Sequence, residues 1–215
     1  MHQIDFHFDV ISPYAWLAFE RLPQALEGLD VVVDYQPLLL AGLLARWGQK
    51  GPAEIVPKRA WTYRQVLWLA QQQGTRLQLP QPHPFNPLAL QRLALACAPA
   101  GGTPSRYVVQ QLFQHVWCRD GADPSAPQAV AALTQTLAPP RDPQGAEVKA
   151  ELRARTEAAA DAGLFGVPTL VWRGMPFFGL DALPMLRAAL QGEAWFDGPD
   201  WQAAGQQPPG LQRLG

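Results

Sequence analysis

Residues 3–16 read Gln-Ile-Asp-Phe-His-Phe-Asp-Val-Ile-Ser-Pro-Tyr-Ala-Trp, and this stretch sets the class of fold. Apolar and polar residues alternate over 3–10, which is the period of a half-buried strand. Ser12 and Pro13 follow at once. Serine is a good N-cap and proline suits the first turn of a helix, so a helix is predicted to begin here.

The chain that follows this turn completes a strand–helix–strand unit. Apolar residues recur at helical spacing from Trp16 until Gly28. Residues 31–38, Val-Val-Val-Asp-Tyr-Gln-Pro-Leu, are rich in β-branched side chains and predict a second strand. A helix that joins two parallel strands is the unit from which α/β sheets are built.

The middle of the chain has a different pattern. It predicts helices, and no convincing strand, over 40–47, 57–73, 86–98, 105–117 and 126–137. A segment of this length without a strand indicates a helical insertion within the α/β unit.

Strands return near the C-terminus. A helix over 144–162 precedes a strand over 167–172 and a short partner strand over 176–178, and Asp181 is expected to cap a final helix that ends at Leu190.

This order of elements is typical of the thioredoxin topology, so we predict an α/β, thioredoxin-like fold with a large all-helical insertion. An α/β protein of another type is the alternative. The predicted thioredoxin-like domain consists of 1–38 and 144–191, and the insertion of 39–143. Residues 192–215 are rich in Gly, Pro and Gln and are expected to form a loosely held tail.

Charge and composition exclude several classes of function. The 215 residues include 17 Lys+Arg and 18 Asp+Glu, a net charge of −1, which argues against nucleic acid as a partner. No apolar stretch reaches the roughly 18 residues of a membrane span, and residues 1–5 do not resemble a secretory signal, so we expect a cytoplasmic protein without a membrane partner. Cys97 and Cys118 have the spacing of neither a redox pair nor a metal site. We therefore predict no metal and expect both to be core thiols.

The chemistry of this topology lies where the first helix begins. A redox enzyme would carry Cys-x-x-Cys there, but residues 12–15 are Ser-Pro-Tyr-Ala, which cannot exchange a disulfide. The positive end of the helix dipole remains, and the Ser12 hydroxyl can donate a hydrogen bond to a thiolate that a small cofactor supplies. Alternatively, Ser12 only caps the helix.

The second half of such a site is a loop that ends in a cis-proline before the third strand. Residues 165–169, Phe-Gly-Val-Pro-Thr, match it. Val167, before Pro168, presents an N–H and a C=O on which an extended peptide such as glutathione can pair. The alternative is an ordinary proline at the start of a strand.

Several stretches together resemble the 2-hydroxychromene-2-carboxylate isomerase family, which is related to kappa-class glutathione transferases and to periplasmic disulfide oxidoreductases. The resemblance extends from about residue 3 to 191. Its stretches are Phe-Asp-Val-Ile-Ser-Pro-Tyr-Ala-Trp at 8–16, Gly-Gln-Lys-Gly-Pro-Ala-Glu at 48–54, His-Pro-Phe-Asn-Pro at 83–87, Phe-Gly-Val-Pro-Thr at 165–169 and Phe-Phe-Gly-Leu-Asp-Ala-Leu at 177–183.

The resemblance implies a glutathione site. Ser12 would lie beside the cofactor sulfur as the catalytic residue, while Val167 would pair with the glutathione backbone. The γ-glutamyl end would be held by residues 179–181, where Asp181 can accept the α-ammonium or act only as an N-cap. The implied glutathione-binding residues are Ser12, Val167, Pro168, Gly179, Leu180 and Asp181.

The implied substrate site departs from the family pattern. A family lysine falls on Ala45, next to Arg46, and a family tyrosine falls near His83. Arg46 can bind a carboxylate or be solvated, and His83 can act as an acid–base group or lie exposed in its Pro-rich loop. The expected substrate-binding residues are Arg46, Trp47, His83 and Asn86. A further set of aromatic residues would line a substrate pocket or, alternatively, belong to the core: Trp16, Trp47, Trp61, Trp68 and Phe85.

The resemblance implies a glutathione-dependent cis–trans isomerase acting on an unsaturated aromatic pyruvate, and a homodimer. A kappa-like glutathione transferase and a non-redox glutathione- or peptide-binding protein are the alternatives.

Overall fold

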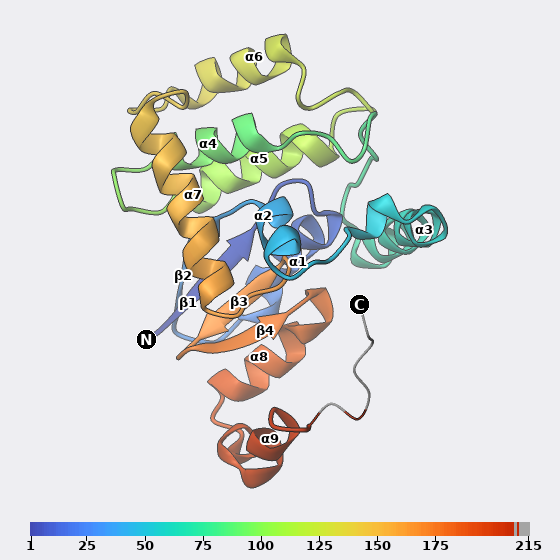
Figure 1. The fold of residues 1–215 in the computed structure, drawn as a ribbon, viewed down its shortest axis with the longest axis vertical. Coiled ribbons are helices and arrows are strands. Elements are labelled where there is room, and N and C mark those ends of the chain that lie inside the picture. The colour runs from blue at the N-terminus through green and yellow to red at the C-terminus, as the bar shows by residue number, and fades with distance from the viewer. Residues whose placement is uncertain (209, 211–215) are drawn as a thin grey trace.

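The computed structural model describes residues 1–208 and 210, and a four-stranded sheet lies at its centre (Figure 1). The strands are β1 (His2–Phe8), β2 (Val31–Pro37), β3 (Thr169–Trp172) and β4 (Met175–Phe178). Their order is β2-β1-β3-β4, in which β1 is parallel to β2 and antiparallel to β3, and β4 is antiparallel to β3. This topology confirms the predicted α/β, thioredoxin-like fold.

The alternation along β1 separates two layers. Ile4, Phe6 and Phe8 are fully buried in one cluster with α1 (Pro13–Ala25) and α8 (Leu183–Leu190). Helix α7 (Ala146–Asp161) packs beside β2, where it contributes to two smaller clusters. Strand β1 thus alternates between residues buried in the main cluster and residues that are only partly buried on its other face.

The helices between β2 and α7 form the predicted insertion. They are α2 (Leu40–Arg46), α3 (Val56–Gln73), α4 (Leu88–Ala96), α5 (Arg106–Trp117) and α6 (Pro127–Leu137), with a 3₁₀ turn at Pro52–Glu54. In Figure 1, α4 and α5 lie between the sheet and α6, while α3 stands to one side.

The insertion shares the largest hydrophobic cluster with the sheet. Phe113 of α5 packs against Phe8 of β1 and against Trp16 and Phe19 of α1, with ring centroids 5.3–5.7 Å apart. Since aromatic rings bury large apolar areas, this contact joins the two predicted domains into one packing unit.

The structure corrects three expected boundaries. The strand predicted over 167–172 begins at Thr169. The strand predicted over 3–10 ends at Phe8, because Asp9 begins a turn in which the Ser12 N–H donates to the Asp9 carbonyl at 3.0 Å. Asp181 is not the N-cap of the final helix: it lies inside a 3₁₀ turn, Leu180–Ala182, and Ala182 precedes α8.

The segment after α8 is more ordered than expected. It contains a 3₁₀ turn, Ala194–Asp197, and helix α9 (Pro199–Ala204). Phe196 is buried and its ring packs against Phe177, Trp195 and Trp201. Aromatic packing thus holds residues 194–204 on the fold, while 209 and 211–215 of the predicted tail lie outside the described residues. Among the helices that the structure describes, none has the length and apolarity to cross a membrane.

Candidate functional site

The turn between β1 and α1 brings together the two halves of the predicted site. Ser12 is the N-cap of α1, where its Oγ accepts the Ala15 N–H at 3.2 Å. The same Oγ donates to the carbonyl of Val167 at 3.3 Å. Val167 and Pro168 are joined by a cis peptide bond, as expected. Residues separated by 155 positions in the sequence are therefore in direct contact.

The environment of Ser12 favours negative charge. Its side chain is 6% exposed and lies at the N-terminus of a 13-residue helix, where the dipole is positive. The 3.3 Å bond to Val167 is longer than the usual O–H···O range of about 2.5–3.0 Å. A stronger acceptor placed nearby, such as a thiolate, can therefore compete for this proton.

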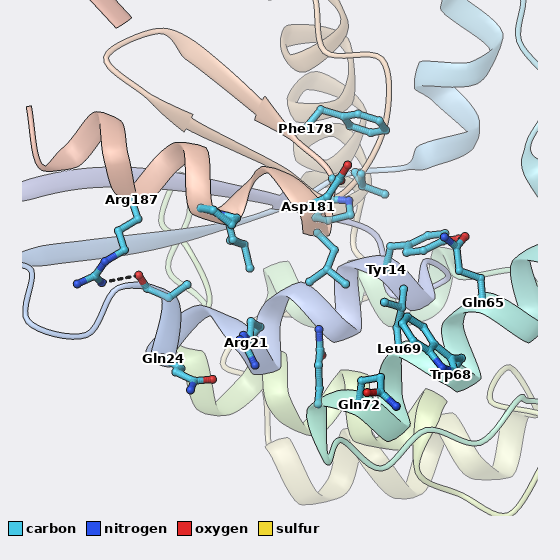
Figure 2. A pocket seen from close by; sticks show the side chains of 18 of the residues that line it. Tyr14, Arg21, Gln24, Gln65, Trp68, Leu69, Gln72, Phe178, Asp181 and Arg187 are labelled. Carbon is cyan, nitrogen blue, oxygen red and sulfur yellow. Dashed lines mark hydrogen bonds between the residues drawn. The ribbon is translucent and has the colours of Figure 1, made fainter. Parts of the chain in front are cut away.

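A groove of about 1030 Å³ opens beside this turn. Its walls are α1, α3 and the segment from β4 into α8, and Figure 2 shows their side chains facing one another across it. Ser12 itself does not line the groove, although Tyr14 and Val167 beside it do. Five of the predicted glutathione-binding residues are among the lining residues: Val167, Pro168, Gly179, Leu180 and Asp181.

Gly179 holds the loop after β4 against the proline. Its N–H donates to the Pro168 carbonyl at 2.9 Å, and its φ of 97° is one that a residue with a side chain rarely adopts. A Cβ here would lie 2.5 Å from Oδ1 of Asp181. Within residues 1–208 and 210, the Val167 N–H has no hydrogen-bond partner, so it is open to a ligand backbone.

Aromatic side chains flank the groove on both sides. Trp68 of α3 is 58% exposed and Phe178 of β4 is 46% exposed, while the Phe165 and Phe178 rings are 4.6 Å apart. The Tyr14 hydroxyl donates to Gln65 of α3 at 2.6 Å, and burial raises the pKa of Tyr14. The bond between Tyr14 and Gln65 thus joins α1 to α3 at the wall of the groove, which Trp68 also lines (Figure 2).

Three of the predicted substrate-binding residues lie elsewhere. Arg46 pairs with Asp161 at 3.4 Å and lines a second groove, between α2, α4 and α7. The Trp47 indole donates to the Leu164 carbonyl at 2.9 Å. Asn86 Oδ1 accepts the Leu88 N–H at 3.0 Å, where α4 begins. Each is engaged in a local contact, and none lines the groove beside Ser12.

His83 lies behind the Ser12 turn and is half-buried, which corrects the expectation of an exposed loop histidine. Its Nε2 is 2.8 Å from the Ile11 carbonyl, and its Nδ1 is 2.7 Å from the Tyr63 hydroxyl. Burial lowers the pKa of His83. Both ring nitrogens therefore have protein partners, and the residue does not line the groove.

The buried acid of this turn, Asp9, was not expected as a site residue. It is 1% exposed, and its carboxylate accepts the N–H groups of Ile11 at 3.1 Å and Leu40 at 2.9 Å. Burial raises its pKa to about 7, and these two hydrogen bonds counteract part of the rise. The sequence signal was a charged residue at the end of an apolar strand, directly before the helix cap.

The aromatic candidates divide between core and surface. Trp16 and Phe85 are buried, whereas Trp47, Trp61 and Trp68 are exposed, and only Trp68 of the five lines the groove beside Ser12.

The two cysteines are half-buried C-caps of α4 and α5, and both pack against the main hydrophobic cluster and are not fully enclosed in it. Burial raises the pKa of Cys97 to about 11 and also raises that of Cys118. Neither therefore supplies a thiolate near pH 7. In the part of the chain that the structure describes, no His, Cys, Asp and Glu side chains cluster in a way that could hold a metal.

A family model for the DSBA-like thioredoxin domain matches residues 3–191 of this chain. The chain belongs to the DSBA-like thioredoxin domain family. Its sequence is similar to glutathione transferases of the kappa type and to 2-hydroxychromene-2-carboxylate isomerases. It is 27% identical to glutathione S-transferase kappa 1 of Rattus norvegicus, over 89% of this chain and 92% of that protein. It is 24% identical to 2-hydroxychromene-2-carboxylate isomerase of Sphingobium xenophagum, over 87% and 97%.

The solved structures show the same fold. A 2-hydroxychromene-2-carboxylate isomerase superposes with a TM-score of 0.75 at 22% identity, covering 96% of this chain and 100% of the other. The cytosolic disulfide reductase DsbM of Pseudomonas aeruginosa, solved with GSH, gives 0.52 at 14% identity and covers 94% and 99%. This DSBA-like chain is thus related to enzymes, with Ser12 and Ala15 where a disulfide enzyme carries cysteines.

Proposed function

We propose that this DSBA-like protein is a glutathione-dependent cis–trans isomerase of the 2-hydroxychromene-2-carboxylate isomerase type. The observation that supports this most is the contact between Ser12 Oγ and the Val167 carbonyl, beside a groove lined by residues 167, 168 and 179–181. A hydroxyl donor and a helix N-terminus at this contact, together with the free N–H of Val167, support a binding position for a thiolate.

Glutathione would bind along this edge. Its cysteine backbone pairs with the open N–H of Val167, and its α-ammonium meets the Asp181 carboxylate. The sulfur then lies between Val167 and Tyr14, within reach of the Ser12 hydroxyl. Ser12 turns its proton from the Val167 carbonyl to the sulfur and is not itself the nucleophile.

The energy required is moderate. A free thiol with a pKa near 8.5 is only a few per cent ionised at pH 7. Lowering that pKa by about two units takes roughly 2.7 kcal/mol of preferential thiolate binding. One hydrogen bond to a charged acceptor, of about 1.5–3 kcal/mol, together with a helix terminus of about 0.3–1 kcal/mol, supplies this amount.

The thiolate adds to the C=C bond of an unsaturated aromatic pyruvate. Its electron pair forms the C–S bond, and the π electrons move into the adjoining carbonyl as an enolate. The former double bond is now single and rotates. When the enolate re-forms the C=C bond, the thiolate leaves, so the trans isomer and glutathione are released with no net redox change.

A kappa-like glutathione transferase is the second candidate, and the position of Arg46 favours it. Arg46 is paired with Asp161 in the other groove and so does not offer its charge to a substrate carboxylate beside Ser12. An electrophile without a carboxylate would not need that cation. An assay separates the two functions, because a transferase consumes glutathione and an isomerase returns it.

Ser12→Ala tests the proposed role of the hydroxyl. We expect turnover to fall about 10- to 100-fold, while the glutathione Kd from calorimetry changes by less than about threefold, because the lost bond forms mainly to the thiolate. Equal turnover in wild type and variant would favour the third alternative, a non-catalytic glutathione- or peptide-binding protein. No binding to the wild type at millimolar glutathione would reject the proposal.

The homodimer, expected from the resemblance, and the cytoplasmic location, expected from the sequence pattern, stay predictions. Analytical ultracentrifugation with and without glutathione tests the first, and fractionation of cells that express the protein tests the second.

A further inference from the structure

The turn that carries Ser12 is held from behind by side chains of the helical insertion. The indole of Trp117, at the end of α5, donates to the Val10 carbonyl at 2.9 Å. His83, in the loop between α3 and α4, contacts the next carbonyl, that of Ile11, at 2.8 Å. The rings of His83 and Trp117 also pack together, with centroids 5.4 Å apart.

The protonation of His83 at Nε2 follows from its partner. A carbonyl oxygen only accepts, so Nε2 carries the proton and donates to Ile11. In a neutral imidazole Nδ1 then has no proton, and it can accept the Tyr63 hydroxyl at 2.7 Å. The same hydroxyl lies 2.9 Å from the His83 carbonyl, so its one proton is shared between these two acceptors of the same residue. Tyr63 therefore holds the ring in the tautomer and orientation in which Nε2 faces the Ile11 carbonyl.

The bond to Ile11 acts directly on Ser12. The carbonyl of Ile11 and the N–H of Ser12 belong to one planar peptide group. That N–H already donates to the Asp9 carbonyl at 3.0 Å. The carbonyls of Asp9, Val10 and Ile11 thus each accept a hydrogen bond. These bonds fix the orientation of the peptide plane between Ile11 and Ser12. That orientation in turn directs the Ser12 Oγ toward Val167.

We propose that His83, held by Tyr63, is a positioning residue for Ser12: its Nε2–H bond to the Ile11 carbonyl keeps the hydroxyl aimed at the sulfur position. The catalytic consequence of this positioning rests on the proposed function, whereas the positioning itself does not. Tyr63 belongs to α3, whose Gln65 accepts the Tyr14 hydroxyl at 2.6 Å. Tyr63 and His83 thus also connect helix α3, which forms one wall of the groove, to the turn that carries Ser12.

Four variants isolate this role. His83→Leu removes both ring nitrogens, whereas His83→Gln keeps one N–H donor and one acceptor in a side chain of similar reach. Tyr63→Phe removes only the hydroxyl that orients the ring. The matched control is His115→Leu, since His115 Nε2 makes an equivalent bond to the Pro124 carbonyl at 2.9 Å, within α5 and its following loop.

The first readout needs no ligand. Hydrogen exchange of the amides of residues 9–16 should rise by about tenfold or more in His83→Leu and less in Tyr63→Phe, because the turn loses a restraint. His83→Gln and His115→Leu should exchange like the wild type over this segment. Exchange in His83→Leu that equals the His115→Leu control, or exchange in His83→Gln as fast as in His83→Leu, would overturn the proposal.

The second readout addresses catalysis. The ultraviolet absorbance of the thiolate gives the ionised fraction of bound glutathione at pH 7. We expect this fraction and kcat to fall roughly tenfold or more in His83→Leu, with a much smaller change in KM, and to recover in His83→Gln. If His83→Leu does not fold, the same two readouts are compared between Tyr63→Phe, in which a loss is expected, and His83→Gln, which should behave like the wild type. If the wild type binds no glutathione, the proposed function fails, and the exchange measurement still decides the positioning role.

Discussion

At the scale of single residues, Asp9 is a buried carboxyl group three positions before Ser12, and its hydrogen-bond partners are backbone N–H groups. Its pKa in the folded protein, about 7, lies above the ordinary value of 3.8. The folded state therefore binds this proton more tightly than the unfolded chain does. The stability that Asp9 contributes is fully present below pH 4 and is lost as the pH rises through 7.

Asp9→Asn removes this titration. The difference in unfolding free energy between wild type and variant should therefore fall between pH 4 and 7, by up to about 1.4 kcal/mol per pH unit, and stay level above pH 8. Urea denaturation across this range measures it. Taking the difference cancels the opposite contributions of His7, His83 and His115, whose pKa values burial lowers. A difference that does not change with pH would show that Asp9 titrates as it does in water.

Ser12→Cys tests the electrostatics of the helix N-terminus without glutathione. The thiol at this position should have a pKa below the ordinary 8.5 or so, because the α1 dipole and the N–H groups of its first turn favour the thiolate. It should therefore react with iodoacetamide at pH 7 faster than Cys97 and Cys118, whose pKa values are raised by burial. Mass spectrometry of the labelled protein provides the comparison. Equal labelling of the three thiols would mean that the position does not stabilise negative charge.

At the scale of elements, the connection from β4 into α8 depends on Gly179. Gly179→Ala places a methyl group at a φ of 97° and 2.5 Å from Asp181 Oδ1. We expect a loss of about 1–3 kcal/mol in unfolding free energy and weaker glutathione binding, because Asp181 must move.

The matched control is Gly192→Ala, at the end of α8. Its φ is 79° and a Cβ there would meet nothing within 4 Å. It has the same type of backbone penalty without the contact, so it should leave the glutathione Kd unchanged. If both variants change the glutathione Kd from calorimetry equally, Asp181 does not contribute to glutathione binding.

At the scale of the whole molecule, the shared aromatic core implies that the sheet and the insertion unfold together. Phe113→Ala removes a fully buried ring that contacts Phe8, Trp16 and Phe19, and should cost about 3–5 kcal/mol. Far- and near-ultraviolet circular dichroism should show one coincident transition in wild type and variant.

Trp61→Ala is the control for aromatic truncation on the surface. Trp61 is 63% exposed, and its replacement should change stability by less than about 0.5 kcal/mol. Two separate transitions in the wild type would contradict the single packing unit and would support an insertion that folds by itself.

Local patterns in the sequence were sufficient for the elements of the fold. Alternation over residues 3–10 and β-branched residues over 31–38 predict the strands that the structure has at His2–Phe8 and Val31–Pro37, and Ser12-Pro13 marks where α1 begins. The absence of cysteine from positions 12–15 excludes disulfide exchange at this turn. These inferences succeed because periodicity, capping and the chemistry of a single side chain depend on neighbouring residues.

Only the tertiary structure decided which distant groups meet. It brought Ser12 to Val167, set His83 behind the turn and not in the groove, and paired Arg46 with Asp161 in a different groove. Helix periodicity assigns a residue to a face of its own helix, but not to the surface which that face meets. That surface depends on how the whole chain packs, and for these contacts it lies 72 to 155 residues away.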